Sequence, residues 1–153
     1  MHTAIRGSLY RQFALLPAHA GDFSPDFYQL LQASGMDAVV RHTEAGGTFT
    51  HFTCEKFAAQ SATLELGKVM PFGANDLSLF AAADAAIRAW IADAPLPPRD
   101  KAPVDYFLVE ESIIKREGEF TLNLAADVEN FTALPAGYEI ARQAEKRWVV
   151  QAR

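Results

Sequence analysis

Few side chains of this sequence belong to the types that bind metals or act as nucleophiles. They are four histidines and one cysteine: His2, His19, His42, His51 and Cys54. A zinc site built from one local segment needs spacings such as HxxH or HxxE. Neither spacing occurs, and the nearest match is HAGD, from His19 to Asp22. We therefore expect His19 and His42 to be surface or loop residues.

His51 and Cys54 lie close together in the segment TFTHFTCEKF. A histidine near a thiol is one arrangement that creates a cysteine nucleophile. Such a nucleophile also needs an oxyanion donor and a suitably placed base, and no other motif of the sequence supplies them. We therefore interpret Cys54 as a buried residue.

Glu65 is the most informative carboxylate. It lies between Leu64 and Leu66 in the segment SATLELGK, which is typical of a short apolar strand with one buried face. A buried carboxylate is costly unless it is paired or takes part in chemistry. The pattern alone leaves two structural alternatives open: an edge-strand glutamate that faces water, or an ion-pair partner of Lys68.

The composition limits the class of protein. The chain has 153 residues, half of them hydrophobic, with 14 basic and 19 acidic side chains and a net charge of −5. The absence of a basic stripe argues against nucleic acid as a partner. One cysteine fits a reducing cytoplasm. Since the sequence shows neither a basic-then-apolar leader nor a run of about 18 apolar residues, we expect no export and no membrane partner.

A proline-rich stretch divides the sequence. The segment DAPLPPRDKAPVD holds four of the eight prolines, and prolines favour an extended linker. We therefore predict an α/β unit over residues 1–94, a linker over 95–103 and a small β-rich unit over 104–153.

The upstream unit mixes helices and strands. SPDFYQLLQASG predicts a helix, with Ser24 as N-cap, Pro25 at the first position and Gly35 as the stop. A second helix is expected from Asn75 or Asp76 through NDLSLFAAADAAIRAWI. MDAVVRH and ATLELG predict strands, so the fold class is an α/β sheet with helical cover.

The downstream unit carries mainly strand signals. DYFLVEESIIKR contains two β-rich runs, EFTLNL alternates apolar and polar residues, LPAGYEI is a turn that enters a strand, and RWVVQ predicts another strand.

Three segments together resemble a known family. HTAIRGS, TLELGK followed by PFGAND, and ENFTALPAGYEIA followed by RWVV resemble the succinylglutamate desuccinylase branch of the succinylglutamate desuccinylase/aspartoacylase family, which are zinc hydrolases related to metallocarboxypeptidases. The similarity runs in order from residue 2 to the last residue. It implies a partial zinc-carboxypeptidase-like α/β/α sheet followed by a small, mostly β domain.

The resemblance also implies roles for three residues. His2 occupies the position of the family's later zinc-binding histidine, and Glu65 that of its general base. Arg6 follows the metal histidine and is expected to bind a substrate carboxylate. The implied reaction is hydrolysis of N2-succinyl-L-glutamate to succinate and L-glutamate in arginine catabolism, with one Zn²⁺ per complete active site.

One departure from the family is large. The HxxE segment that supplies the other two zinc ligands is absent, so the chain resembles the second half of an enzyme. We expect the chain alone to lack amidase activity, and uncovered sheet surface to cause self-association or poor stability. Two alternatives stay open: a non-catalytic binding or structural fragment, or an aspartoacylase-like amidase with another N-acyl amino acid as substrate.

Overall fold

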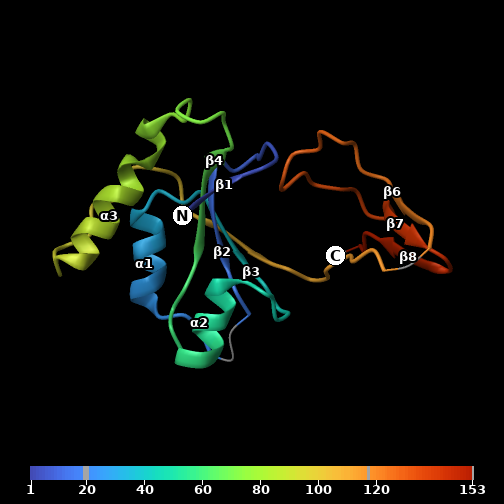
Figure 1. Cartoon of the computed structure of the whole chain (residues 1–153), viewed down its shortest axis with the longest axis horizontal. Coiled ribbons are helices and arrows are strands. Elements are labelled where there is room, and N and C mark those ends of the chain that lie inside the picture. Colours follow the sequence, from blue (N-terminus) through green and yellow to red (C-terminus); the bar gives the residue numbers. More distant parts are fainter. Residues whose placement is uncertain (19–20, 117, 153) are drawn as a thin grey trace.

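Two sheets organise the chain. In the computed structural model, which describes residues 1–18, 21–116 and 118–152, a five-stranded sheet is followed by a three-stranded one (Figure 1). The order in the large sheet is β1-β4-β2-β3-β5. The bounds of these strands, in chain order, are His2–Ala4 (β1), Gln12–Leu16 (β2), Ala38–Arg41 (β3), Thr63–Lys68 (β4) and Asp105–Leu108 (β5).

The large sheet is mixed. β1 is parallel to β4, and β2 and β5 are both parallel to β3, but β4 is antiparallel to β2. The uncovered sheet surface that we expected was that of a parallel sheet, whereas this sheet also contains an antiparallel pair. The predicted class, an α/β sheet followed by a small, mostly β unit, is confirmed. His19 lies outside the described residues.

Helix α1 (Pro25–Ala33) forms as its end signals predict. The hydroxyl of Ser24 accepts a hydrogen bond from the backbone N–H of Phe27 at 3.2 Å, which satisfies one free donor of the first turn. Gly35, just beyond the helix, has a φ of +79° that suits glycine.

The second predicted helix begins later than its pattern suggests. Asp76 caps a short 3-10 helix, Leu77–Phe80 (η1), by accepting a hydrogen bond from the Ser78 N–H. Helix α3 (Ala81–Ile91) follows directly. Asp76 as a cap is therefore confirmed, but the first turn is 3-10 rather than α.

Helix α2 (Phe49–Phe57) was not predicted. Its aromatic residues Phe49, Phe52 and Phe57 are exposed, and Cys54 is its buried residue. Since no apolar stripe of helical period faces the core, the usual sequence signal is absent. The interpretation of Cys54 as buried is confirmed.

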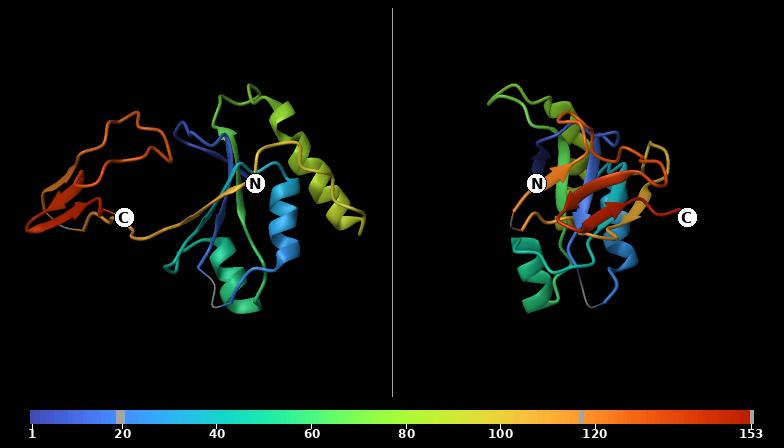
Figure 2. Two further views of the ribbon diagram at one scale, coloured as in Figure 1. Left: turned by 180° about the vertical axis from the view of Figure 1, so that it is seen from behind. Right: turned by 90° about the vertical axis from the view of Figure 1, so that its right-hand side faces the viewer.

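Alternation along the strands separates two faces of the large sheet. One face packs with the helices in a core cluster that includes Ala14, Leu16, Leu64 and Leu66. Figure 2 shows α1 and α3 together on one side of this sheet. Residues of the opposite parity, such as Phe13, belong to a second cluster on the other face. Glu65, between Leu64 and Leu66, therefore points away from the helix-covered core.

The proline-rich linker is anchored to the large sheet. The guanidinium of Arg99 donates to the carbonyls of Gln32 and Met36 at 3.1 and 2.8 Å. The Lys101 ammonium donates to the Gly35 carbonyl and the Asp37 carboxylate, both at 3.0 Å. These contacts lead the chain into β5, so residues 105–108, which we placed in the small β-rich unit, form an edge strand of the large sheet.

The small sheet is antiparallel, in the order β6-β7-β8. Its strands are Phe120–Leu122 (β6), Glu139–Gln143 (β7) and Lys146–Val149 (β8). All three coincide with segments that carry strand signals, whereas the run SIIKR before them forms no strand. Within the described ranges, no helix is long and apolar enough to cross a membrane.

Glu111 contacts the small sheet and is expected to make its stability sensitive to acid. Its Oε1 accepts hydrogen bonds from the Trp148 indole at 2.8 Å and the Lys146 ammonium at 3.2 Å. The Trp148 bond first, and then the Lys146 bond, hold the pKa of Glu111 below its usual value. A carboxyl whose pKa is lowered by folding stabilises the fold above its unfolded pKa, about 4.3, and this contribution is lost as the pH falls through the folded value.

We predict that Glu111→Gln lowers stability at pH 7 and that this difference from the unchanged chain shrinks as the pH falls below about 4.3 and disappears only below the lowered pKa of folded Glu111. Urea unfolding followed by Trp148 fluorescence, in a Trp90→Phe background, measures the effect. A stability difference that does not change between pH 7 and pH 3 would contradict the assignment.

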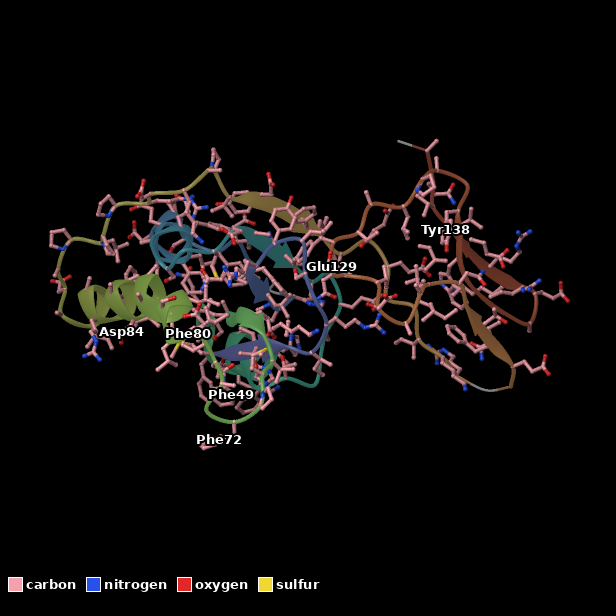
Figure 3. All side chains as sticks on the ribbon, turned by 90° about the horizontal axis from the view of Figure 1, so that it is seen from above. Phe49, Phe72, Phe80, Asp84, Glu129 and Tyr138 are labelled. Carbon is pink, nitrogen blue, oxygen red and sulfur yellow. The ribbon has the colours of Figure 1, made fainter. Side chains whose placement is uncertain are left out.

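The expected self-association has a structural basis in exposed apolar residues. Phe72 projects from the loop after β4 (Figure 3), and Ile5, Leu77 and Ile91 are also largely exposed. β1 is a terminal strand of its sheet, and such strands can pair with other chains.

We expect the measured mass to exceed the monomer mass and to rise with concentration in size-exclusion chromatography with light scattering. Phe72→Ser combined with Ile91→Ser should lower it, whereas Thr121→Ser, at an exposed polar position, serves as the control. A monomer mass at every concentration tested would refute the expectation.

Candidate active site

The parallel pairing of β1 with β4 brings together two of the three residues singled out from the sequence. His2 and Glu65 are Cα partners in this register, and the His2 Nδ1 lies 3.8 Å from the Glu65 Oε1. The imidazole and the carboxylate therefore share one cavity, although they are far apart in the sequence.

Glu65 is buried, with 9% of its surface exposed. β4 lies between β1 and β2, so the alternative of an edge-strand glutamate facing water is wrong. The carboxylate of Glu65 lies within ion-pair distance of His2 rather than of Lys68. Its Oε2 is buried and has no hydrogen-bond partner. An unpartnered buried carboxylate oxygen is costly, and a functional site is one place where such a cost is retained.

His2 is much more exposed than its partner, with a side-chain exposure of 71%. Its Nδ1 lies 3.3 Å from the Thr3 carbonyl oxygen. In the tautomer with a proton on Nδ1, this nitrogen donates to Thr3 and leaves the Nε2 lone pair for another group. Histidines that bind metals commonly have their second nitrogen held in this way.

Arg6 lies in the loop after β1 and lines the same cavity as His2 and Glu65. The cavity has a volume of about 600 Å³. The Arg6 side chain is exposed, and its guanidinium forms no hydrogen bond or ion pair with a described residue. The structure therefore brings all three candidate residues to one cavity and leaves a planar cation free at its wall.

Residues that were not predicted to belong to the site complete the cavity, and one of them, His42, was expected to be a surface or loop residue. Asn130 and Phe131 approach from the segment before β7, and His42 follows β3. ENF, which contains Asn130, served only as part of the family resemblance. No spacing rule connects it with His2 or Glu65, because their proximity arises from the path of the whole chain.

The thiol arrangement considered from the sequence does not form. His51 Nε2 lies 3.7 Å from the Glu55 carboxylate, while the Cys54 thiol donates to the Ala59 carbonyl at 2.9 Å. A buried thiol that donates to the backbone is not positioned as a nucleophile.

The residues present fit part of a zinc site but not a whole one. His2 offers a suitable nitrogen, and Glu65 lines the same cavity, although its unpartnered Oε2 is itself buried. Catalytic zinc needs three protein ligands. Among residues 1–18, 21–116 and 118–152, however, no group of three or more histidine, cysteine, aspartate or glutamate side chains is placed to hold a metal ion. We therefore derive no reaction step through zinc for this chain.

An α/β sheet with a buried carboxylate, an imidazole and a free guanidinium around one cavity is an arrangement suited to hydrolases. The succinylglutamate desuccinylase/aspartoacylase catalytic domain matches residues 1–91, and the AstE/AspA barrel-sandwich hybrid domain matches residues 102–153. The chain belongs to the succinylglutamate desuccinylase/aspartoacylase family of hydrolases, as the sequence resemblance indicated.

Curated relatives are similar along almost the whole chain. The succinylglutamate desuccinylases of Photorhabdus laumondii and Serratia proteamaculans are 46% and 45% identical to it over 151 residues. These alignments cover 99% of this chain and 46% of each relative. The chain therefore spans about half the length of the curated relatives that it matches.

Solved structures agree with this relationship. The succinylglutamate desuccinylase of Vibrio parahaemolyticus superposes with a TM-score of 0.87 at 29% identity, over 98% of this chain and 44% of that one. The Chromobacterium violaceum enzyme superposes with a TM-score of 0.75 at 40% identity, over 90% of this chain and 43% of that one.

The cost of burying Glu65 leads to a prediction. Glu65→Gln keeps the shape of the side chain and removes its charge, so we expect the free energy of unfolding of the chain to rise by about 1 kcal/mol. Urea denaturation at pH 7.5 measures the change. Glu145→Gln, which alters an exposed carboxylate in the β7–β8 turn, should leave stability within about 0.5 kcal/mol. Destabilisation by Glu65→Gln would show that the carboxylate has a stabilising partner.

Proposed function

We propose that this chain forms one wall of the active site of an amide hydrolase of the succinylglutamate desuccinylase type. The reaction is N2-succinyl-L-glutamate plus water to succinate plus L-glutamate. The observation that supports it best is the 3.8 Å approach of His2 to Glu65 in a cavity that Arg6 also lines. The names of the relatives supply the substrate.

Glu65 acts as the proton carrier in this proposal. Its carboxylate accepts a proton from the water whose oxygen bonds to the amide carbon. The same proton then goes to the leaving nitrogen as the carbon–nitrogen bond breaks. A positioned group of this kind contributes about 10²–10⁴ to the rate. Glu65 is suited to the role because it lines the cavity and its Oε1 lies 3.8 Å from the Nδ1 of His2.

Arg6 orients the substrate. N-succinylglutamate carries three carboxylates, and a guanidinium can bind one of them through two parallel hydrogen bonds. Because the guanidinium of Arg6 has no hydrogen bond or ion pair with a described residue, it can bind a carboxylate without breaking an existing contact.

His2 supplies one zinc ligand of the complete active site in this proposal, and the other two come from a segment outside this chain's described residues. A zinc ion held there would supply Lewis-acid chemistry, which would activate a water molecule and polarise a carbonyl group. The chain alone is therefore inactive.

The reaction belongs to arginine catabolism, and the single cysteine fits a reducing cytoplasm.

A non-catalytic fragment is the second candidate. The observation that favours it is the absence of a three-ligand group in the part of the chain that the structure describes. An amidase for another N-acyl amino acid, such as N-acetylaspartate, is the third, since the matching catalytic-domain model covers both succinylglutamate desuccinylase and aspartoacylase.

The test compares the chain alone with a chimera. The chain is joined to the part of the Photorhabdus laumondii relative that it does not cover, and glutamate release from N-succinylglutamate is measured with added zinc. We expect no release by the chain alone, turnover by the chimera, and a loss of about 10²–10⁴ in kcat on Glu65→Gln.

Two controls decide between the candidates. A folded chimera that hydrolyses neither N-succinylglutamate nor N-acetylaspartate would favour the non-catalytic fragment. Faster hydrolysis of N-acetylaspartate would favour the third candidate. Retention of turnover within tenfold by Glu65→Gln would refute the role of Glu65.

A further inference from the structure

Phe131 has an unusual backbone conformation at the edge of the cavity. Its φ is +67°, a left-handed value that is unfavourable for a bulky residue. Its ring lies 4.8 Å from the Tyr10 ring, 5.0 Å from the Phe13 ring and 5.2 Å from the Phe107 ring, between centroids. These aromatic contacts hold a conformation that the residue would not adopt alone.

The residue before it, Asn130, is fixed by its backbone. The Asn130 N–H donates to the Gly7 carbonyl at 2.9 Å, and its carbonyl accepts from the Leu9 N–H at 3.2 Å. Both bonds connect it to the loop that carries Arg6. Figure 3 shows the adjacent Glu129 between the large and the small sheet, so this segment is the point where the two parts meet.

The side chain of Asn130 has no such internal partner. The residue lines the cavity together with His2, Arg6 and Glu65, and it is half-buried. Its carboxamide forms no hydrogen bond with a described residue. The carboxamide is therefore free to contact a ligand, to which it offers both donors and an acceptor. A ligand in the cavity would supply the missing partner.

We propose that Asn130 is a further substrate-binding residue, whose carboxamide N–H₂ donates to a carboxylate of an N-acylated acidic amino acid. This inference rests on the proposed function, because that function supplies the ligand class. Asn130 and Arg6 form two donors on one wall, held together by the backbone bonds between their segments. The strained backbone at Phe131 fixes the position from which Asn130 enters the cavity.

The test uses the full chain and N-succinylglutamate, titrated in a ¹H–¹⁵N correlation experiment. The Asn130 side-chain amide signals are assigned by their loss in Asn130→Asp. We expect these signals to shift on titration, Asn130→Ala to weaken binding about tenfold, and Asn130→Asp to weaken it further. The aspartate has the same shape but opposes the ligand's charge, so a merely structural role does not predict this order.

Asn75→Asp is the matched control, since it adds the same charge beside a neighbouring cavity that Asn130 does not line. It should bind like the unchanged chain. Binding by Asn130→Ala and Asn130→Asp within twofold of the unchanged chain would overturn this inference alone. If the unchanged chain shows no binding of N-succinylglutamate, the binding role of Arg6 in the proposed function fails as well.

Discussion

The register of β1 against β4 is the constraint on which the site depends. A shift of one residue in a strand moves every side chain to the opposite face, so His2 would leave Glu65 for the other side of the sheet. β1 is only three residues long and pairs with β4 alone in the described sheet. The position of the imidazole therefore depends on very few backbone hydrogen bonds, whereas β4 and Glu65 are held on both sides.

The second constraint is the contact between the Asn130–Phe131 segment and the β1–β2 loop, which are far apart in the sequence. The Asn130–Phe131 segment follows β6, and it reaches the β1–β2 loop through two backbone hydrogen bonds and a set of aromatic contacts. Figure 1 shows this orange segment beside the blue loop that carries Arg6. The backbone cost at Phe131, about 1–3 kcal/mol, is offset by this packing. The cavity is thus a product of both parts of the chain, and neither part forms it alone.

The sequence predicted what local signals determine. Ser24 and Gly35 defined α1, and the apolar strand around Glu65 gave β4. It did not predict α2, because Phe49 and Phe52 are exposed and leave no periodic stripe. β5 joined the large sheet through the anchoring of the linker by Arg99 and Lys101, a long-range contact without a local signature.

The distinction between local signals and long-range contacts also applies to the site. The resemblance provided the identities of His2, Glu65 and Arg6, and the structure provided their proximity. Asn130 could not be found from spacing, because it reaches the cavity only when β6, the loop after it and the β1–β2 loop are all in place. Asn130 is recognised as a candidate only in the structure, which shows that it lines the cavity and that the backbone of the next residue, Phe131, is in the left-handed region.

Electrostatics explains why the local donors matter more than the overall charge. The chain carries a net charge of −5, and the proposed substrate is itself an anion, so the field of the whole protein opposes binding. Salt screens charges beyond about 8 Å at physiological ionic strength, while Arg6 lines the cavity itself. At this range a bidentate guanidinium outweighs the screened distant carboxylates. Glu65 is the exception, since its charge lies inside the cavity. Arg6 is a positive group in the lining of the same cavity and offsets this charge.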